Sequence, residues 1–174
     1  VGHVALDANT TGSSNIAVGS NALGANTTAN NNTAIGYAAM QASTTGTSNV
    51  AVGTNALDAN TTGNDSTAVG HEALTTATGG TVSNTAVGYQ TLEDCTGNYN
   101  TAIGTEALHQ TATANINTAI GFRAGYTNVS GYNNTFLGVE TYGSANNAVN
   151  QIVIGKGAVG QGDNYAVIGN ADIT

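Results

Sequence analysis

The amino-acid sequence predicts an all-β parallel solenoid, or β-roll, of about ten 17-residue coils. Three observations predict this fold: a short motif returns at a fixed interval, helix-forming residues are scarce, and the apolar residues lack a helical period. Of the 174 residues, 24 are glycine, none is proline, and only 7% are charged, against roughly 25% in an ordinary soluble domain. We therefore expect stacked short strands rather than a globular core.

An Ile/Val/Leu-Gly pair carries the repeat. Successive glycines are 17 residues apart, apart from one interval of 18, one of 16 and a final one of 14. Equivalent residues of stacked coils lie about 4.8 Å apart, so ten coils predict a rod of roughly 50 Å. The repeat glycines form the glycine column: Gly2, Gly19, Gly36, Gly53, Gly70, Gly88, Gly104, Gly121, Gly138, Gly155 and Gly169.

Each coil is expected to hold two short strands with a turn after each. In the first segment, Thr-Ala-Ile-Gly, alternate side chains point to opposite faces. The residue before each glycine is predicted to form the structural core, and we call this set the branched column: Val18, Ile35, Val52, Val69, Val87, Ile103, Ile120, Leu137, Ile154 and Ile168. The preceding residue defines the alanine column on the other face: Ala17, Ala34, Ala51, Ala68, Ala86, Ala102 and Ala119.

Two further patterns accompany this strand. An Ala-Leu pair such as Ala56-Leu57 follows the glycine, and its neighbouring side chains are expected to face opposite ways. Four residues before the glycine stands an asparagine, and stacked amides of this kind can form a hydrogen-bonded ladder. This asparagine column contains Asn15, Asn32, Asn49, Asn84, Asn100, Asn117 and Asn134.

The strand is apolar on both faces, which is typical of a strand that is covered on two sides. A single thin solenoid needs only one apolar face per strand. We therefore predict that several chains cover one another, most simply as a homotrimer.

The motif Asn-Thr-Ala-Ile-Gly-x-x-Ala-Leu, clear at residues 100–108, resembles head-domain repeats of YadA-type trimeric autotransporter adhesins and related repeats of phage tail-fibre proteins. Residues 150–155 and 166–170 are similar to segments that precede an endosialidase-type chaperone domain in such fibres. The resemblance implies a left-handed parallel β-roll, three packed protomers and a role in display or attachment. It also implies an extracellular location, on a virion tail fibre or a bacterial cell surface. The adhesin repeats are shorter than the 17 residues used here.

The repeat divides the chain into two parts. Residues 1–142 are predicted to form the regular solenoid, and residues 143–174 the final, less regular coils that lead to a missing C-terminal region. The chain begins and stops inside a repeat, whereas terminal repeats normally need caps. We therefore expect an ordered segment of a longer fibre.

Charge and cysteine content exclude several classes of protein. Ten acidic residues and two basic ones give a net charge of −8, so a nucleic-acid partner is not expected. No apolar run approaches the roughly 20 residues of a membrane span, so this segment is not expected to insert into a membrane. The single cysteine, Cys95, excludes an intrachain disulfide framework.

No catalytic, cofactor or metal site is predicted. Residues 155–160 match G-x-G-x-x-G, but the glycines and polar residues that follow do not read as the helix that a dinucleotide site requires. His3 and His71 follow repeat glycines four coils apart, which prevents a shared metal within one chain. Aromatic faces suit sugar rings, so a glycan contact is predicted at Tyr126, Tyr132 and Tyr142.

The sequence thus favours a non-enzymatic structural or adhesive segment of an extracellular trimeric fibre, whose partner would be a cell-surface glycan or a protein receptor. The alternative is an ice-binding solenoid that turns a Thr-x-Val/Ile face outward and leaves alanine in a narrow core. The residues three positions before the glycine form the threonine column of that face: Ile16, Thr33, Val50, Thr67, Thr85, Thr101, Thr118, Thr135 and Ile152. Because Ile and Val replace Thr here, β-branched packing explains this column better than the hydroxyl does.

Overall fold

The computed structural model describes residues 1–78 and 82–171, and the described residues form an all-β solenoid. Ten three-residue strands pair in parallel, in chain order, within one sheet. The prediction of an all-β parallel solenoid with 17-residue coils is therefore confirmed, while handedness and trimeric state stay predictions. The strands are β1 (Ile16–Val18), β2 (Thr33–Ile35), β3 (Val50–Val52), β4 (Thr67–Val69), β5 (Thr85–Val87), β6 (Thr101–Ile103), β7 (Thr118–Ile120), β8 (Thr135–Leu137), β9 (Ile152–Ile154) and β10 (Ala166–Ile168).

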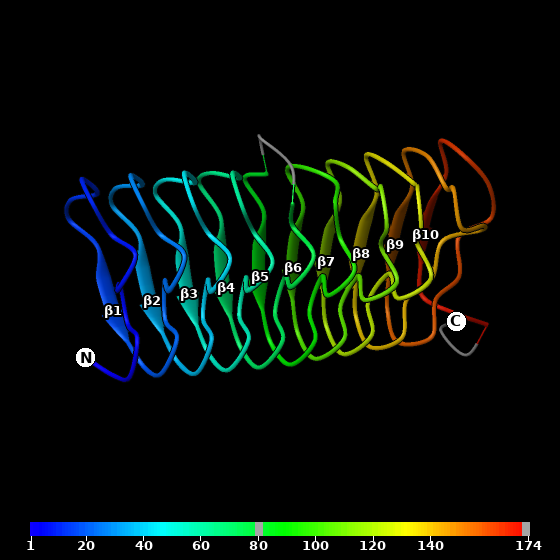
Figure 1. Ribbon diagram of the computed structural model, residues 1–174. Coiled ribbons are helices and arrows are strands. Elements are labelled where there is room, and N and C mark those ends of the chain that lie inside the picture. Colours follow the sequence, from blue (N-terminus) through cyan, green and yellow to red (C-terminus); the bar gives the residue numbers. More distant parts are fainter. Residues whose placement is uncertain (79–81, 172–174) are drawn as a thin grey trace.

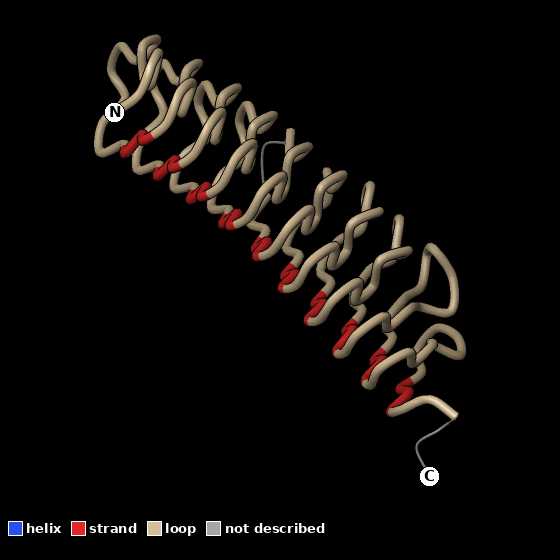
Figure 2. The backbone as a smooth tube through the Cα atoms, turned by 90° about the horizontal axis from the view of Figure 1, so that it is seen from below, coloured by secondary structure: helices blue, strands red, loops and turns tan. Residues whose placement is uncertain are grey.

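The coils stack into a rod, with the termini at opposite ends (Figure 1). All ten strands line one side of the rod, and the turns of each coil make up the rest of its cross-section (Figure 2). Strands pair with equivalent residues opposite one another, for example Thr101 with Thr118 and Ile103 with Ile120. The sheet therefore repeats the same columns of side chains along one long face.

The core of each coil holds the alanine column, not the branched column. The middle residue of each strand points inward, and Ala34, Ala68 and Ala102 are fully buried. A Leu or Met from the turn fills the remaining space, as Leu57 and Leu74 do. Where leucine or methionine fills the coil, the strand position therefore holds alanine.

The predicted second strand is absent from the described coils, where a turn takes its place. Leu57 has a left-handed φ of 54°, and this conformation recurs at the equivalent Leu or Met of the other regular coils. The reversal brings both Ala56 and Leu57 inside, where each is fully buried. The expectation that the pair faces opposite ways is wrong, because side-chain alternation holds only for an extended backbone.

The glycine column is required by conformation and by close contact. Gly53 has a φ of 139°, a region that residues with a Cβ rarely adopt. A Cβ added there would lie 2.3 Å from the carbonyl oxygen of Gly70 in the next coil. The glycines therefore allow adjacent coils to approach at sheet spacing.

The asparagine column forms an internal ladder that precedes the strands. The Asn117 backbone N–H donates to Asn100 Oδ1 at 3.0 Å, and the Asn117 side-chain amide donates to the Gly131 carbonyl at 2.9 Å. The Asn134 backbone N–H continues the pattern by donating to Asn117 Oδ1. Ser66 and Gln151 occupy the same column where asparagine is missing. Each amide thus pairs buried backbone groups that would otherwise lose their hydrogen bonds.

The core changes composition from β8 onward. Phe136 replaces alanine in β8, and Gly125 stands where the preceding coil has Leu108. A Cβ on Gly125 would lie 2.6 Å from the Phe136 ring, so the aromatic ring occupies the volume that leucine leaves free. This exchange keeps the core filled. The strands β9 and β10 continue the same sheet. The division of the chain at residue 142 stays a prediction.

Candidate functional site: the outer strand face

One side of the described solenoid is a distinctive surface, the outer face of the sheet. It is made by the first and third residues of the strands, that is, the threonine column and the branched column. Ile103 is 40% exposed, Leu137 42% and Ile152 46%. The middle residues between them are buried, so this face is the side of the sheet turned away from the core.

The prediction that the branched column forms the structural core is therefore wrong for the single chain. Val18, Ile35, Ile103, Ile120, Leu137 and Ile168 are exposed, and Val52, Val69, Val87 and Ile154 are half-buried. Thr and Ile/Val do share one face of the strand and Ala occupies the other, as predicted. The Thr and Ile/Val face points outward rather than inward, because the narrow coil has room for alanine but not for a second large side chain beside leucine.

The outer face is regular along the rod. Parallel pairing in register places branched residues next to branched residues, as in Val52 with Val69 and Ile120 with Leu137. Equivalent side chains therefore recur about every 4.8 Å. No strand residue of this face is charged, so the ten strands present a continuous uncharged ridge of Thr, Val, Ile and Leu, with Ala166 at the first position of β10.

The ladder and the glycines hold this face in place. The asparagine column hydrogen-bonds the backbone immediately before the strand of the next coil, as when the Ser66 backbone N–H, one residue before β4, donates to Asn49 Oδ1 at 2.9 Å. The glycine column ends each strand with a positive φ. Both strand ends are thus set by contacts between coils, which leaves the outer side chains little freedom to move out of register.

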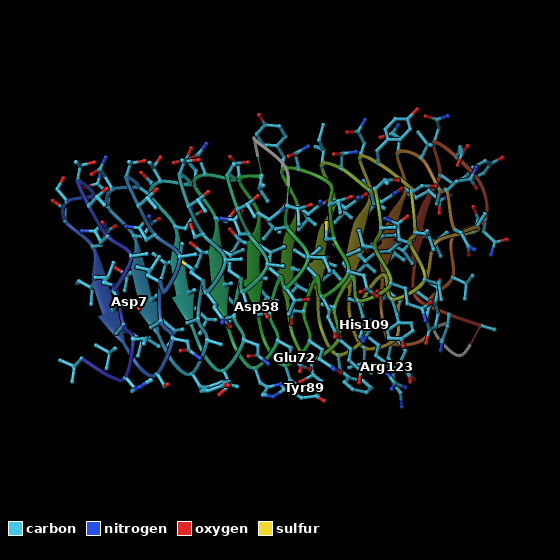
Figure 3. All side chains as sticks on the ribbon, in the orientation of Figure 1. Asp7, Asp58, Glu72, Tyr89, His109 and Arg123 are labelled. Carbon is cyan, nitrogen blue, oxygen red and sulfur yellow. The ribbon has the colours of Figure 1, made fainter. Side chains whose placement is uncertain are left out.

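Charged and aromatic side chains gather on the turns after β4 to β7. Glu72, Tyr89 and Arg123 lie along one edge of the rod, with His109 beside them (Figure 3). Arg123 Nε donates to Glu106 Oε2 at 2.5 Å, an ion pair between consecutive coils. These contacts stabilise the edge beside the outer face rather than the face itself.

Burial raises the pKa of two acids on the turns, Glu93 after β5 and Asp58 after β3. His109 Nε2 lies 3.1 Å from Glu93 Oε2. Desolvation raises the pKa of Glu93, and the nearby His109 opposes that rise. Desolvation also raises the pKa of Asp58. Both carboxyl groups are thus more easily protonated than free acids.

The predicted glycan residues do not form one platform. Tyr126 lies against His109, with ring centroids 5.3 Å apart, and under the Arg123 guanidinium. Tyr142 follows β8 and bridges Val159, whereas Tyr132 precedes β8 and bridges Asn115 and Val149. Tyr132, which is 48% exposed, thus belongs to a different row of bridges from Tyr142. A glycan contact at these positions stays a prediction.

The described part of the chain contains no group of three or more His, Cys, Asp or Glu side chains placed to hold a metal ion. Within residues 1–78 and 82–171 there is also no helix long and apolar enough to cross a membrane. The thiol of Cys95 is buried, and desolvation raises its pKa to about 12.

Comparison of the chain with family models, with curated proteins and with solved structures finds no match to any of them.

Proposed function

We propose that the chain is a structural and adhesive segment of an extracellular homotrimeric fibre, on a phage tail fibre or a bacterial surface, used for display or attachment. The outer strand face is the observation that carries this proposal. In this account the chain needs no cofactor and performs no catalysis. A cell-surface glycan or a protein receptor is its external partner.

The outer face has the chemistry of a covered surface. Large contiguous apolar patches on soluble proteins mark interaction sites, and this ridge extends over all ten strands. Complete burial of a half-exposed Ile or Val side chain contributes about 1 kcal/mol. Ten such residues per protomer supply on the order of 10 kcal/mol, enough to favour association.

A cyclic trimer covers this face in the simplest closed way. Three parallel rods around a common axis can turn their ridges inward, so that every coil contributes to the interface. The resemblance of the Asn-Thr-Ala-Ile-Gly motif to trimeric adhesin and tail-fibre repeats supports the number three. The turns, with their charged and polar groups, then face the solvent and any receptor.

Light scattering and circular dichroism on an Ile103→Asp variant test the proposal. Ile103 is at the centre of the ridge, so the charge is expected to reduce the trimer to a folded monomer. Gln110→Asp, an exposed change on the turn side, is the matched control and should remain trimeric. A wild-type chain that is monomeric, or an Ile103→Asp chain that stays fully trimeric, would refute the proposed interface.

A second candidate, ice binding, is favoured by one observation: the Thr-x-Val/Ile pairs do face outward. In this reading the regular ridge of β4 to β8, with Thr at every first position, would adsorb to ice rather than to other chains. Ile16, Val50 and Ile152 interrupt the threonine column elsewhere. Thermal hysteresis of the purified chain would support this candidate, and Thr101→Leu should then abolish part of the effect. Absence of hysteresis at millimolar concentration would exclude it.

A further inference from the structure

The repeat allows each coil to be compared with its neighbours at equivalent positions. Two residues after the glycine column, every regular coil has a left-handed φ. Asparagine tolerates this region better than most residues and occurs there as Asn21 and Asn55, whereas later coils have Glu106 and Arg123. The turn therefore forms without these charged side chains, and the fold does not account for them.

A second position shows the same contrast. Five residues after the glycine column, the turns after β1 and β4 have Gly24 and Thr75. The turns after β6 and β7 have His109 and Tyr126 instead. The preceding residue keeps a left-handed φ in all four coils, so the backbone of the turn is the same. Large side chains are thus present on a turn that a glycine can complete.

The ion pairs found within residues 1–78 and 82–171 all lie on these turns. They join His71 to Glu72 at 3.4 Å, Glu93 to His109 at 3.1 Å, and Glu106 to Arg123. We call this surface, made by residues 71–72, 89–93, 105–109 and 122–126, the paired edge, and it follows one side of the rod (Figure 3). Each basic side chain of the paired edge has an acid beside it.

Aromatic rings accompany the ion pairs. The Tyr89 ring stacks on His71, with centroids 5.5 Å apart and an interplanar angle of 13°. The Arg123 guanidinium lies 5.0 Å from the ring centroid of Phe122 and 5.4 Å from that of Tyr126. Tyr89 remains 46% exposed and Phe122 40% exposed. The paired edge therefore presents apolar rings, held in place by their neighbours, next to groups that donate and accept hydrogen bonds.

The exposed rings are spaced along the rod. Tyr89 and Phe122 both follow a repeat glycine directly and are two coils apart, which corresponds to about 9.6 Å. Thr105 holds the same position in the coil between them, and Glu106 is the next residue. An elongated ligand that lies along the rod can therefore reach both rings and the Glu106–Arg123 pair.

Sugar chains have the matching chemistry. The C–H face of a pyranose ring packs on an aromatic ring, and its hydroxyl groups can donate to a carboxylate and accept from a guanidinium. A charged ligand fits less well, because a cation competes with Arg123 for Glu106 and an anion competes with Glu106 for Arg123. An uncharged chain adds its hydrogen bonds without breaking an ion pair.

We propose that the paired edge binds an uncharged sugar chain that lies along the rod, with its rings on Tyr89 and Phe122 and its hydroxyl groups at the Glu106–Arg123 pair. This inference rests on the proposed function, because it selects a glycan as the external partner and assigns its place. It does not depend on how copies of the chain associate.

Titration with cellohexaose, an uncharged and flat chain of pyranose rings, tests the binding. Isothermal titration calorimetry should show saturable binding with a Kd of about 1 mM or below. Galacturonate and glucosamine chains of the same length test the charge argument, and both should bind at least about tenfold more weakly. Lack of saturation at about 10 mM cellohexaose, roughly ten times that Kd, or tighter binding of either charged chain, would overturn the proposal.

Two variants take their new residues from an earlier coil, so they are expected to fold. Arg123→Asn introduces the residue type of Asn55, and Tyr89→Thr that of Thr54. Each should weaken cellohexaose binding by about tenfold. Arg123→Asn should melt at the wild-type temperature or above it, because asparagine suits the left-handed φ. A marked drop in melting temperature, or wild-type affinity in either folded variant, would remove the assignment to the paired edge.

The matched control is Tyr37→Thr. Tyr37 has the same position in its coil as Tyr89 and is 56% exposed, but Ala38 follows it in place of a charged or amide side chain. This variant should bind cellohexaose as the wild type does. An equal loss of affinity in Tyr37→Thr and Tyr89→Thr would mean that any exposed tyrosine suffices, which contradicts a site at the paired edge.

Light scattering on the same samples separates this inference from the proposed function. A trimer that does not bind cellohexaose overturns the glycan site and leaves the fibre segment intact. A monomer that binds cellohexaose, and loses binding in Arg123→Asn, supports the site and refutes the trimer.

Discussion

The inner and outer sides of the strands tolerate different kinds of variation. Along β2 to β7 the inner residue is always alanine, whereas the outer residues change between Thr and Val and between Val and Ile. The inner position first changes at β8, where Phe136 comes with the compensating Gly125, and it is valine in β9 and β10. Inside, the fixed cross-section of the coil determines the volume of each side chain. Outside, only an uncharged and mostly β-branched surface is maintained, as an interface with a similar chain would require.

The largest expected difference in stability is between substitutions of two neighbouring residues, Ala102 and Ile103, whose side chains face opposite sides of the sheet. Ala102→Asp places an unpaired carboxylate in the filled core, and we expect it to lower the free energy of unfolding by at least about 4 kcal/mol. Ile103→Asp, one residue later, should lower the free energy of monomer unfolding by less than about 1 kcal/mol, because its side chain faces outward. Chemical denaturation of both variants, followed at a concentration where Ile103→Asp is monomeric, gives the two values. Similar losses would show that the two faces have been assigned wrongly.

The glycine column gives the next largest effect. Gly70→Ala adds a Cβ that would lie 2.2 Å from the Gly88 carbonyl oxygen, at a φ of 141°. Coils must separate to accommodate it, so we expect a loss of about 3 kcal/mol in the free energy of unfolding. Thermal melting measures the loss, and Gly157→Ala is a suitable comparison because only the Asn170 side-chain amide lies within 4 Å of the added Cβ. Both sites share a positive φ, so equal losses would show that backbone conformation, not contact between coils, is the cause.

The asparagine ladder should contribute a smaller amount. Asn117→Ala removes the acceptor of the Asn134 backbone N–H and the donor to the Gly131 carbonyl. Leaving these buried groups unpaired is expected to cost about 2 kcal/mol. Denaturant titration measures it, and Asn115→Ala, whose side chain is half-buried outside the ladder, should cost clearly less. A cost below 0.5 kcal/mol at Asn117, on the order of an ordinary surface change, would mean that the ladder does not hold the strands.

The smallest expected effect concerns pH. The pKa of Asp58 is raised in the folded chain, chiefly by desolvation, so the folded state holds its proton more tightly than the unfolded state does. The stabilisation from this group is therefore complete below the unfolded pKa, near 4, and is lost as the pH rises through the higher folded pKa. Asp58→Asn should raise the melting temperature slightly at pH 7 and leave it unchanged at pH 3. If Asp58→Asn melts at a lower temperature than the wild type at both pH values, the predicted direction of the pH effect is wrong.

Much of the fold could be predicted from the sequence because one motif repeats at sheet spacing. The positions of the strands, the glycine contacts and the amide ladder all follow from the period. The turn that replaces the expected second strand could not be predicted, because nothing in the Ala-Leu pair indicates the left-handed conformation of Leu57. The sequence analysis also turns the wrong face of the strands inward, although the small size of Ala102 indicates a narrow core. Size, rather than hydrophobicity, decides which face of a thin coil points inward.

The candidate site was predictable only in part. The apolar character of both strand faces is visible in the sequence and led to the expectation of a partner chain. Proximity in the sequence groups the three tyrosines, whereas in the fold Tyr132 bridges Asn115 and Val149 and Tyr126 packs against His109.

Small-angle X-ray scattering of the wild-type chain tests the central claim most directly, because it measures mass per unit length. One chain of 17.1 kDa extends over ten coils, which is about 48 Å at sheet spacing. If the outer faces pack together in a parallel trimer, three times 17.1 kDa, about 51 kDa, will occupy that same length. A rod with the mass per length of a single chain, whether a monomer or chains joined end to end, would contradict the account.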